Sequence, residues 1–378
     1  MAEECSHECG SCGVSGRGER TAAGPPKLDT NNRSNVKHVI GVVSGKGGVG
    51  KSLVTSLLAS EMNKRGNKVG ILDADITGPS IPKTFGITNP LTADADGILP
   101  GQTQPGIKLM STNLMLPKGD LPVAWRGPVV SNAIRQFWSE TNWGDIDYLF
   151  VDMPPGTSDV LLTVFQSLPV DGIVTVSAPQ ELVAMIVGKA VNLAHDMDVE
   201  VLGLVENMAY FKCDDCGKEH HIFGEPQGAE VAERYNIPAY TTLPIDPKFA
   251  RLCDEGKVED YDVEGKLDVI IDKIVEAGEK QEEKAADAKQ RLELMQRDYD
   301  ELQMKFMGLE SRKDEYMNRT RTENETKDYY SEVNETKRRL DRAQAQLSKA
   351  GAKYREEEEK RGRAESEKNT AMLNLEVV

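Results

Sequence analysis

One glycine-rich segment constrains the fold of this chain more than any other feature, and it reads Gly45-Lys46-Gly47-Gly48-Val49-Gly50-Lys51-Ser52. It fits the phosphate-binding loop pattern G-x-x-x-x-G-K-[ST]. Glycines let successive backbone N–H groups turn toward one anion, and the positive end of the following helix points at the same phosphates. The pattern predicts that Lys51 reaches the β- and γ-phosphates of a nucleotide and that the Ser52 hydroxyl holds Mg²⁺.

The segments on either side of this loop have the character that the pattern requires. Residues 36–44 form an apolar run typical of a buried strand. After the loop, Leu53, Leu57, Leu58 and Met62 recur at helical spacing. A strand, a glycine loop and a helix in this order favour a true phosphate site over a chance glycine-rich turn.

Further apolar runs predict the rest of the fold. They lie at residues 68–73, 148–152, 172–176 and 201–205. Helical patterns separate several of them, for example at residues 183–197. Buried strands that alternate with helices predict an α/β fold, a doubly wound and mostly parallel sheet with helices on both faces. A ligand is then expected at the carboxyl ends of the strands.

Carboxylates stand at two of these predicted strand ends. Asp73 and Asp75 close the second run, and Asp152 closes the third. One such aspartate alone is more typical of a turn cap. Because two strand ends of one sheet carry acids beside a phosphate loop, we expect a Mg²⁺ site, with Asp152 in the Walker B position.

Composition narrows the class of partner. The formal net charge is −16, which argues against nucleic acid, since phosphates require a basic face. The sequence has no apolar run of about 18 residues and no apolar region near Met1, so neither a membrane span nor a signal peptide is expected. We therefore expect a cytoplasmic protein whose six cysteines are metal or cluster ligands rather than disulfides.

Three of the cysteines lie in residues 1–35, a polar segment that is expected to be a flexible tail. Cys5, Cys9 and Cys12 are spaced closely enough to bind one metal centre. They would need a fourth ligand, from His7 or from another chain, and an unstructured thiol cluster is an equal alternative. These cysteines are a candidate second metal site.

Cys213 and Cys216 form a C-x₂-C pair within the predicted sheet domain. A [4Fe–4S] cluster takes four thiolates, and a two-fold homodimer would supply them with the cluster on its axis. The alternative is a structural zinc site completed by His220 and His221. Adjacent histidines point in different directions, which makes the zinc site less favoured.

The second lysine of the loop, Lys46, resembles the deviant Walker A motif of the SIMIBI class of P-loop ATPases, which includes MinD, ParA, the nitrogenase iron protein and Mrp. The resemblance implies that Lys46 reaches the nucleotide of a partner subunit. It also implies roles for strand-end residues: Asp75 would activate water, Asp73 would support the metal, Gly156 would sense the γ-phosphate, and Asn207 would contact adenine. A structural role of Asn207 in an Asx turn is nearly as well supported as contact with adenine.

Several longer segments are similar to the Mrp/ApbC family of ATP-dependent iron–sulfur cluster carriers. They are residues 73–82 (DADITGPSIP), 125–128 (WRGP), 151–157 (VDMPPGT), and 206–208 (ENM) followed by the C-x₂-C pair. The resemblance covers roughly residues 36–265. It implies that the cofactors are ATP and Mg²⁺, that a [4Fe–4S] cluster is held between two subunits, and that the partners are apo iron–sulfur proteins and a cluster-assembly scaffold.

Other functions remain open on the sequence. A MinD- or ParA-like switch ATPase would bind a membrane or DNA, which the acidic charge disfavours. A zinc-stapled ATPase would be a scaffold for other proteins. Nucleotide-dependent electron transfer, as in the nitrogenase iron protein, would require the cluster to change redox state while it stays bound.

The last part of the chain has a different composition. The sequence divides into residues 1–35, an ATPase domain at 36–275 and a charged extension at 276–378, which suggests an added function in oligomerisation or in binding a partner whose identity is unknown. A heptad seam is formed by Leu292, Met295, Tyr299, Leu302, Phe306 and Leu309. After a mostly polar stretch, Val333, Leu340, Leu347 and Tyr354 recur at sevens, one register away. This predicts a long charged helix or a weak coiled coil, which an antiparallel return would complete. A solvated single helix or partial disorder is an equal alternative.

Overall fold

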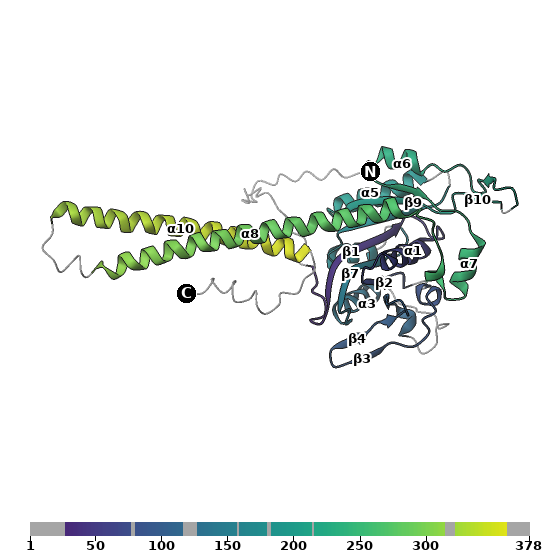
Figure 1. Ribbon diagram of the computed structural model, residues 1–378, viewed down its shortest axis with the longest axis horizontal. Helices are drawn as coiled ribbons and strands as arrows, with labels where there is room; N and C mark the ends of the chain where they lie inside the picture. The colour runs from purple at the N-terminus through teal and green to yellow at the C-terminus, as the bar shows by residue number, and fades with distance from the viewer. Residues whose placement is uncertain are drawn as a thin grey trace, which may run out of the picture.

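The computed structural model describes residues 27–76, 80–115, 127–156, 159–179, 183–213, 215–313 and 322–360. Its centre is an eight-stranded sheet with the strand order β12-β9-β8-β1-β7-β2-β6-β5 (Figure 1). The strands are β1 Asn35–Ser44, β2 Val69–Asp73, β5 Gly101–Gln102, β6 Lys108–Met110, β7 Asp145–Asp152, β8 Gly172–Ser177, β9 Glu200–Glu206 and β12 Tyr240–Thr242. All neighbouring pairs are parallel except β5 with β6.

Helices cover both faces of this sheet, and each face has its own hydrophobic core. One core joins the sheet to α1 Lys51–Lys64, α7 Pro247–Asp254 and the start of α8 Asp268–Ser311. The other joins it to α3 Gly127–Ser139, α4 Asp159–Ser167 and α5 Val183–Asp196. The predicted doubly wound α/β fold is therefore confirmed, and its central strands are buried on both sides, as their continuous apolar runs required.

Shorter elements decorate the edges of the sheet. They are α2 Ile81–Thr84, β3 Thr92–Asp94, β4 Gly97–Leu99, the 3-10 turn Thr112–Leu114, β10 Phe211–Lys212, β11 Glu219–His220, α6 Gly228–Arg234 and the 3-10 turn Val258–Asp260. β3 pairs with β4, and β10 pairs with β11, each as a small antiparallel hairpin. The β10–β11 hairpin extends beyond the carboxyl end of β9.

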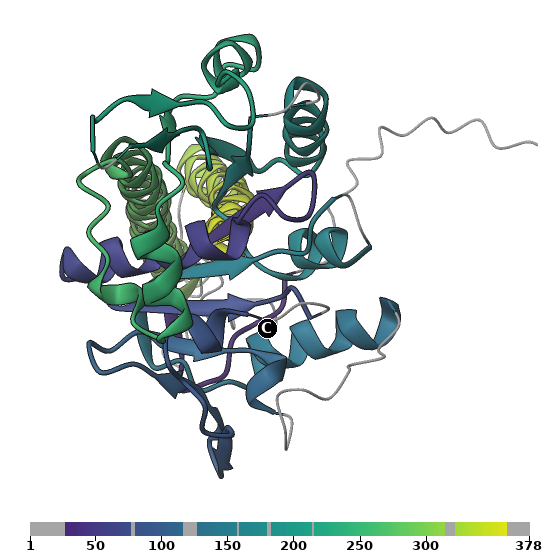
Figure 2. The same cartoon turned by 90° about the vertical axis from the view of Figure 1, so that its right-hand side faces the viewer.

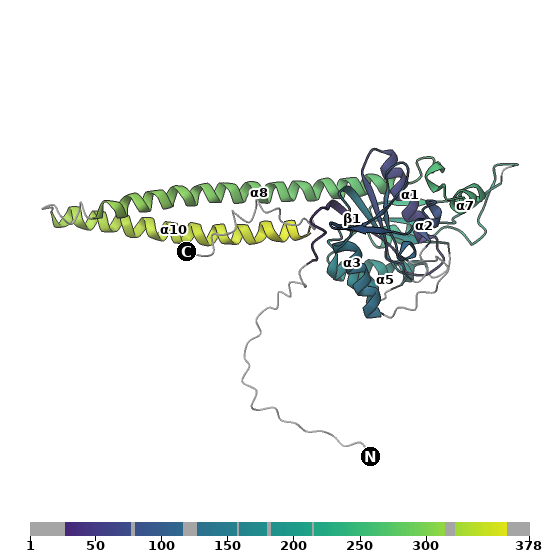
Figure 3. The same ribbon diagram turned by 90° about the horizontal axis from the view of Figure 1, so that it is seen from below.

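Two long helices form an arm at the opposite end of the body. α8 runs without a break from the core, where Ile270, Ile271 and Ile274 are buried, to Ser311. α10 Glu323–Lys360 returns beside it (Figures 1 and 3). The boundary expected near residue 275 thus lies inside α8. Within the described ranges, none of the helices is long and apolar enough to cross a membrane.

The contacts between the two helices fix their direction. The Tyr329 hydroxyl donates a hydrogen bond to the Leu309 carbonyl at 2.7 Å, and Lys305 pairs with Glu332 at 3.3 Å. The two helices are therefore antiparallel. On α10 the partly or fully buried positions that complete the seam include Tyr329 and three small or polar residues, Thr336, Ala343 and Ala350.

A polar substitution in this seam is expected to separate the arm without unfolding the body. Leu347 is buried between the helices, so Leu347→Asp should cost about 2–5 kcal/mol of local stability. Limited proteolysis should then cut α10 rapidly, while the thermal unfolding of the body stays unchanged. Ala345→Asp, at an exposed position two residues away, is the matched control. Equal protease resistance in the two variants would contradict a packed arm.

Candidate functional site

The glycine-rich loop joins the end of β1 to the start of α1. Gly48 and Gly50 have φ angles of +82° and +80°, a left-handed conformation that favours glycine. The Val54 amide donates to the Gly50 carbonyl at 3.0 Å, which begins the helix directly after the loop. The loop amides therefore lie at the positive end of a 14-residue helix, as a phosphate site requires.

Lys51 lies at the centre of a buried polar cluster. Its Nζ is 2.7 Å from Asp152 Oδ1 and 3.6 Å from Asp75 Oδ2. The Ser52 hydroxyl donates to Asp152 Oδ2 at 2.5 Å. Burial raises the pKa of Asp152, and the charge of Lys51 together with hydrogen bonds from Lys51, Ser52 and Thr55 opposes that rise.

Asp73 adds a second buried carboxylate to the cluster. It stands opposite Asp152 in the register of β2 and β7. The Ser111 hydroxyl donates to Asp73 Oδ2 at 2.9 Å, and the Asp75 amide donates to Asp73 Oδ1 at 3.2 Å. Burial, and next the charge of Asp152, raise the pKa of Asp73 well above its ordinary value.

These residues fit a magnesium site. Two buried carboxylates on neighbouring strand ends, both with raised pKa, share the single positive charge of Lys51, so their negative charge is only partly balanced and a further cation is favoured. Carboxylate and hydroxyl oxygens are the ligands that Mg²⁺ prefers. The predicted donors Ser52, Asp73 and Asp152 are therefore brought together by the fold, with the carboxylate of Asp75 beside Lys51 at their edge.

Two members of the cluster were missed in the sequence. Thr55, one helical turn after Lys51, places its hydroxyl 2.9 Å from Asp152 Oδ1. Ser111 follows β6, a strand of only three residues that gives no apolar run. The spacing of Thr55 from Lys51 on a predicted helix was an available signal; no comparable signal existed for Ser111.

Removing the Thr55 hydroxyl should weaken the hydrogen bonding of Asp152 in the polar cluster around Lys51. The Thr55 oxygen is also 3.0 Å from the Lys51 carbonyl. Because the hydroxyl has one proton, and a hydrogen bond to a charged carboxylate is the stronger of the two, Thr55 donates to Asp152. Thr55→Val is expected to lower nucleotide turnover about tenfold, because Asp152 loses a donor that favours its ionised form. Thr55→Ser keeps the hydroxyl and should stay near the parent rate in a steady-state assay. Equal rates for Val and Ser would contradict the assignment.

Two other predicted residues lie at the rim of the loop. Lys46 is exposed, and its carbonyl accepts a hydrogen bond from the Ser44 hydroxyl at 3.0 Å. Gly156, with φ +81°, donates its amide to the Ser44 carbonyl at 2.8 Å. The segment after Asp152 therefore contacts the residue that leads into the loop.

Asn207 also contacts the loop. Its Nδ2 donates to the Val49 carbonyl at 3.0 Å, and its own amide donates to the Ser177 carbonyl at the end of β8. A Cβ on Gly50 would lie 2.2 Å from the same Nδ2. The side chain therefore touches the nucleotide loop directly, and its predicted contact with adenine stays a prediction.

The C-x₂-C pair lies on the β10–β11 hairpin. The Cys213 amide donates to the Lys218 carbonyl at 3.0 Å, and the Gly217 amide donates to the Cys213 carbonyl at 2.8 Å. Gly217 takes a φ of +69°, which closes the turn. Cys213 is half-buried and Cys216 is exposed, and neither forms a disulfide. The turn thus presents the pair at the outer end of the hairpin.

The neighbouring histidines do not gather around these thiols. His220 is exposed on β11, and His221 places Nδ1 3.1 Å from the Ala209 carbonyl. Among the residues that the structure describes, no group of three or more His, Cys, Asp or Glu side chains surrounds these thiols to hold a metal ion. Cys5, Cys9 and Cys12 lie outside those residues, so their proposed second site stays a prediction. Cys253, by contrast, is buried in α7, as expected of a small core residue.

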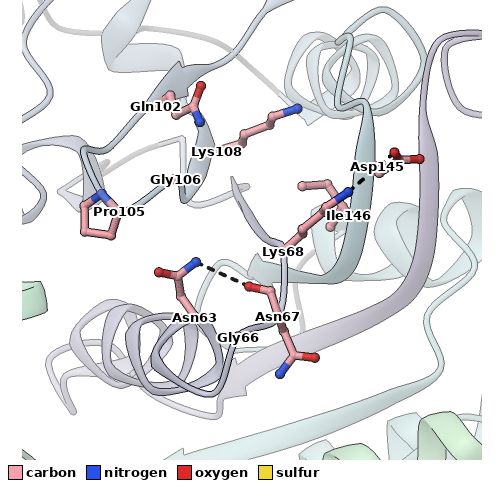
Figure 4. Close-up of a pocket in the computed structure, with 10 residues that line it drawn as sticks. All are labelled: Asn63, Gly66, Asn67, Lys68, Gln102, Pro105, Gly106, Lys108, Asp145 and Ile146. Carbon is pink, nitrogen blue, oxygen red and sulfur yellow. Dashed lines mark hydrogen bonds and ion pairs between the residues drawn. The ribbon is translucent and has the colours of Figure 1, made fainter.

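A polar hollow lies at the opposite, amino-terminal edge of the sheet (Figure 4). Its volume is about 570 Å³, and the Lys108 ammonium donates there to the Trp143 carbonyl at 2.5 Å. It is lined by Asn63, Gly66, Asn67, Lys68, Gln102, Pro105, Gly106, Lys108, Asp145 and Ile146. It includes none of the predicted site residues and is separated from them by the length of α1, β2 and β7.

Comparison with known proteins adds independent information. Residues 35–277 match the family model described as NUBPL iron-transfer P-loop NTPase. An "iron-sulfur cluster carrier protein" of Clostridium perfringens is 45% identical over 275 residues, which cover 71% of this chain and 96% of that protein. A "probable cytosolic Fe-S cluster assembly factor" of Schizosaccharomyces japonicus is 41% identical over 244 residues, 60% of this chain and 40% of that protein.

A solved structure has the same fold. It is a nucleotide-binding protein from Archaeoglobus fulgidus in complex with ADP, 45% identical, with a TM-score of 0.55. The alignment covers 60% of this chain and 89% of that one. The family model ends at residue 277, so most of the arm lies beyond the matched region.

Proposed function

Because the chain belongs to the family of NUBPL iron-transfer P-loop NTPases, we propose that it is an ATP-dependent carrier that holds a [4Fe–4S] cluster between two subunits and delivers it to apo-proteins. The observation that carries the proposal is one hairpin. It carries the thiols of Cys213 and Cys216 a few residues from Asn207, which touches the nucleotide loop.

The buried polar residues around Lys51 supply the groups for ATP hydrolysis. The amides of the loop and the Lys51 ammonium hold the phosphates, and Asp75, at the edge of the cluster, orients the attacking water. Ser52 and Asp152, supported by Asp73, would hold Mg²⁺, which would supply positive charge to neutralise the phosphates. Lys46, exposed at the rim, extends to the nucleotide of the second subunit.

The iron–sulfur cluster is the cargo of this carrier. Cys213 and Cys216 provide two of the four thiolates that a [4Fe–4S] cluster takes, and the described residues around them add no third ligand. A second copy, related by a two-fold axis, would complete the set. This favours a homodimer that forms around the cluster over a local zinc site.

The exposed apolar side chains of the body support the same arrangement. Five of them lie on or directly beside elements that begin or end at the carboxyl edge of the sheet, namely Met115, Val129, Met185, Ile222 and Phe223; Leu99 and Val269 belong to β4 and α8. Figure 2 views the molecule from this end, with the two helices of the arm behind the sheet. The arm leaves from the other edge and therefore does not obstruct a second copy.

Delivery to apo-proteins and receipt from a cluster-assembly scaffold follow from the carrier role. The cytosolic description of the Schizosaccharomyces japonicus relative, together with thiols that a cluster requires in reduced form, favours a cytoplasmic location. The arm is a surface for a further partner.

Anaerobic reconstitution with iron and sulfide tests the proposal. Iron, sulfide and zinc should be measured on the parent, on Cys213→Ser/Cys216→Ser and on Cys253→Ser. We expect about one [4Fe–4S] cluster per dimer in the parent, its near-complete loss in the double variant, and no change in the Cys253 control, whose thiol is buried. A variant that lacks residues 1–20 reports separately on Cys5, Cys9 and Cys12.

The outcomes separate the alternatives. Tight zinc without a cluster would overturn the carrier proposal and favour a zinc-stapled scaffold ATPase. If a cluster forms but moves to an apo-acceptor at the same rate with and without ATP, the protein still binds a cluster. Its transfer is then not coupled to ATP. Binding to vesicles or DNA in the presence of ATP would indicate a switch ATPase of the MinD or ParA kind.

A further inference from the structure

We infer that the turn at Asn207 and Met208 transmits the state of the nucleotide loop to the cysteine hairpin, so that Asn207 is a positioning residue for the cluster thiols. The inference rests on the proposed function and deepens it, because it names the route by which nucleotide would regulate the cargo site.

The first step of the route is a contact between the turn and the loop. Asn207 is buried, and its Nδ2 donates to the Val49 carbonyl at 3.0 Å. The space beside Gly50 is so narrow that a Cβ there would lie 2.2 Å from Asn207 Nδ2 and 3.5 Å from the Met208 methyl. Any shift of Val49 or Gly50 on binding phosphate therefore displaces this turn or breaks its hydrogen bond.

The second step is a rigid change of direction. Met208 has a φ of +57°, which a non-glycine side chain rarely adopts and which the surrounding packing must hold in place. The next residue, Ala209, is buried, and its amide donates to the Leu243 carbonyl at 2.9 Å. The chain leaves the sheet at this point, held firmly on the side of Leu243.

The third step ties both strands of the hairpin to this segment. The Ala209 carbonyl lies 3.1 Å from His221 Nδ1, just after β11. The Tyr210 carbonyl accepts from the Ile245 amide at 2.7 Å, and Phe211 pairs with His220 across the hairpin. Because Cys213 follows directly on β10, a movement at Asn207 reaches it through Ala209, Tyr210 and the paired strand β10, which are hydrogen-bonded to neighbouring segments.

This geometry has a chemical consequence. Two copies that share one cluster hold it only while four thiolates stay at bonding distance. A small rotation of each hairpin changes the separation of the two cysteine pairs. Nucleotide state would thereby alter the grip on the cluster without any contact between nucleotide and cluster.

Hydrogen exchange on the full-length apo protein tests the route without a cluster. Peptides that cover residues 45–52 and 209–220 should be followed with and without a non-hydrolysable ATP analogue and Mg²⁺, at nucleotide concentrations that saturate each protein. In the parent we expect slower exchange in both peptides, by about fivefold or more in the hairpin. Asn207→Asp keeps the size of the side chain and removes the donor to Val49, so the hairpin response should disappear while the loop stays protected.

A second variant and a control complete the test. Met208→Gly suits the positive φ, so it should fold, and it removes the side chain beside Gly50; it should reduce the hairpin response severalfold. Asn236→Asp makes the same chemical change at an exposed residue with φ +52° on the far side of α6 and should leave the response intact.

Each failure has a separate meaning. A protected loop with an unchanged hairpin in the parent, or a full hairpin response in both Asn207→Asp and Met208→Gly, overturns this inference and leaves the proposed function standing. A loop that the nucleotide never protects overturns both.

Discussion

Lys51→Met is expected to lower nucleotide turnover by at least about a thousandfold. The Lys51 ammonium is almost fully buried, 2.7 Å from Asp152 and 3.6 Å from Asp75, and it is the charge that the loop offers to the β- and γ-phosphates. Methionine keeps the apolar stem and removes only that charge. Steady-state phosphate release measures the effect.

The variant should nevertheless remain folded. Removing Lys51 leaves Asp152 without its closest cation, but burial already raises the pKa of this carboxyl, so it can take up a proton instead of remaining a buried charge. Circular dichroism and thermal unfolding check this point. Lys68→Met, at an exposed lysine at the far end of β2, is the control and should keep the parent rate. Turnover within tenfold of the parent in Lys51→Met would sink the assignment.

Gly50→Ala is expected to weaken nucleotide binding by at least about a hundredfold, or roughly 2.7 kcal/mol. The residue has a φ of +80°, and its new methyl group would lie 2.2 Å from Asn207 Nδ2. Because Asn207 is buried and hydrogen-bonded to Val49, the loop must move away from it, and its amides then no longer converge on one phosphate. Isothermal titration with ATP and Mg²⁺ measures the loss.

Gly48→Ala separates backbone strain from this overlap. Gly48 has nearly the same φ, +82°, but a Cβ there meets nothing within 4 Å. Without nucleotide, Gly48→Ala should cost only the strain of a left-handed alanine, about 1–2 kcal/mol. Gly50→Ala should cost at least about 1 kcal/mol more. Equal destabilisation in denaturant unfolding would mean that Asn207 does not hold the loop.

The long buried strands could be predicted because both faces of the sheet are covered. Residues 36–44 and 172–176 were predicted as strands from apolar runs alone, and β1 and β8 occupy nearly the same ranges. β6 and β12 have three residues each and lie toward the edges of the sheet. Their positions depend on tertiary pairing, which leaves no periodic signal in so short a segment.

The arm shows a different limit. The large residues of its seam were visible at heptad spacing, but Ala343 and Ala350 complete it on α10. Small side chains at these positions let the helices approach, and they cannot be distinguished in sequence from an exposed helical surface. The sequence therefore does not distinguish an antiparallel coiled coil from a single long helix. The contact of Tyr329 with Leu309 shows that the two helices lie side by side.

The candidate site could be predicted only as far as its motifs extend. Lys51, Ser52, Asp73 and Asp152 meet because strand ends converge at one edge, a rule that applies to any parallel sheet. The contact of Asn207 with Val49 depends on how closely the end of β9 approaches the loop. Glycine at position 50 permits this close approach, but the pattern that identifies the loop does not specify what packs against it.

The arm also determines how the molecule diffuses. α8 alone has 44 residues, so at about 1.5 Å per residue it is roughly 66 Å long. A protein with a rod on one side of a rounded body has a larger frictional drag than a compact protein of the same mass. On a sizing column calibrated with spherical proteins, a monomer would elute early and be mistaken for a larger assembly. Light scattering, which weighs the particle independently of its shape, is therefore the measurement that can count subunits before and after a cluster is loaded.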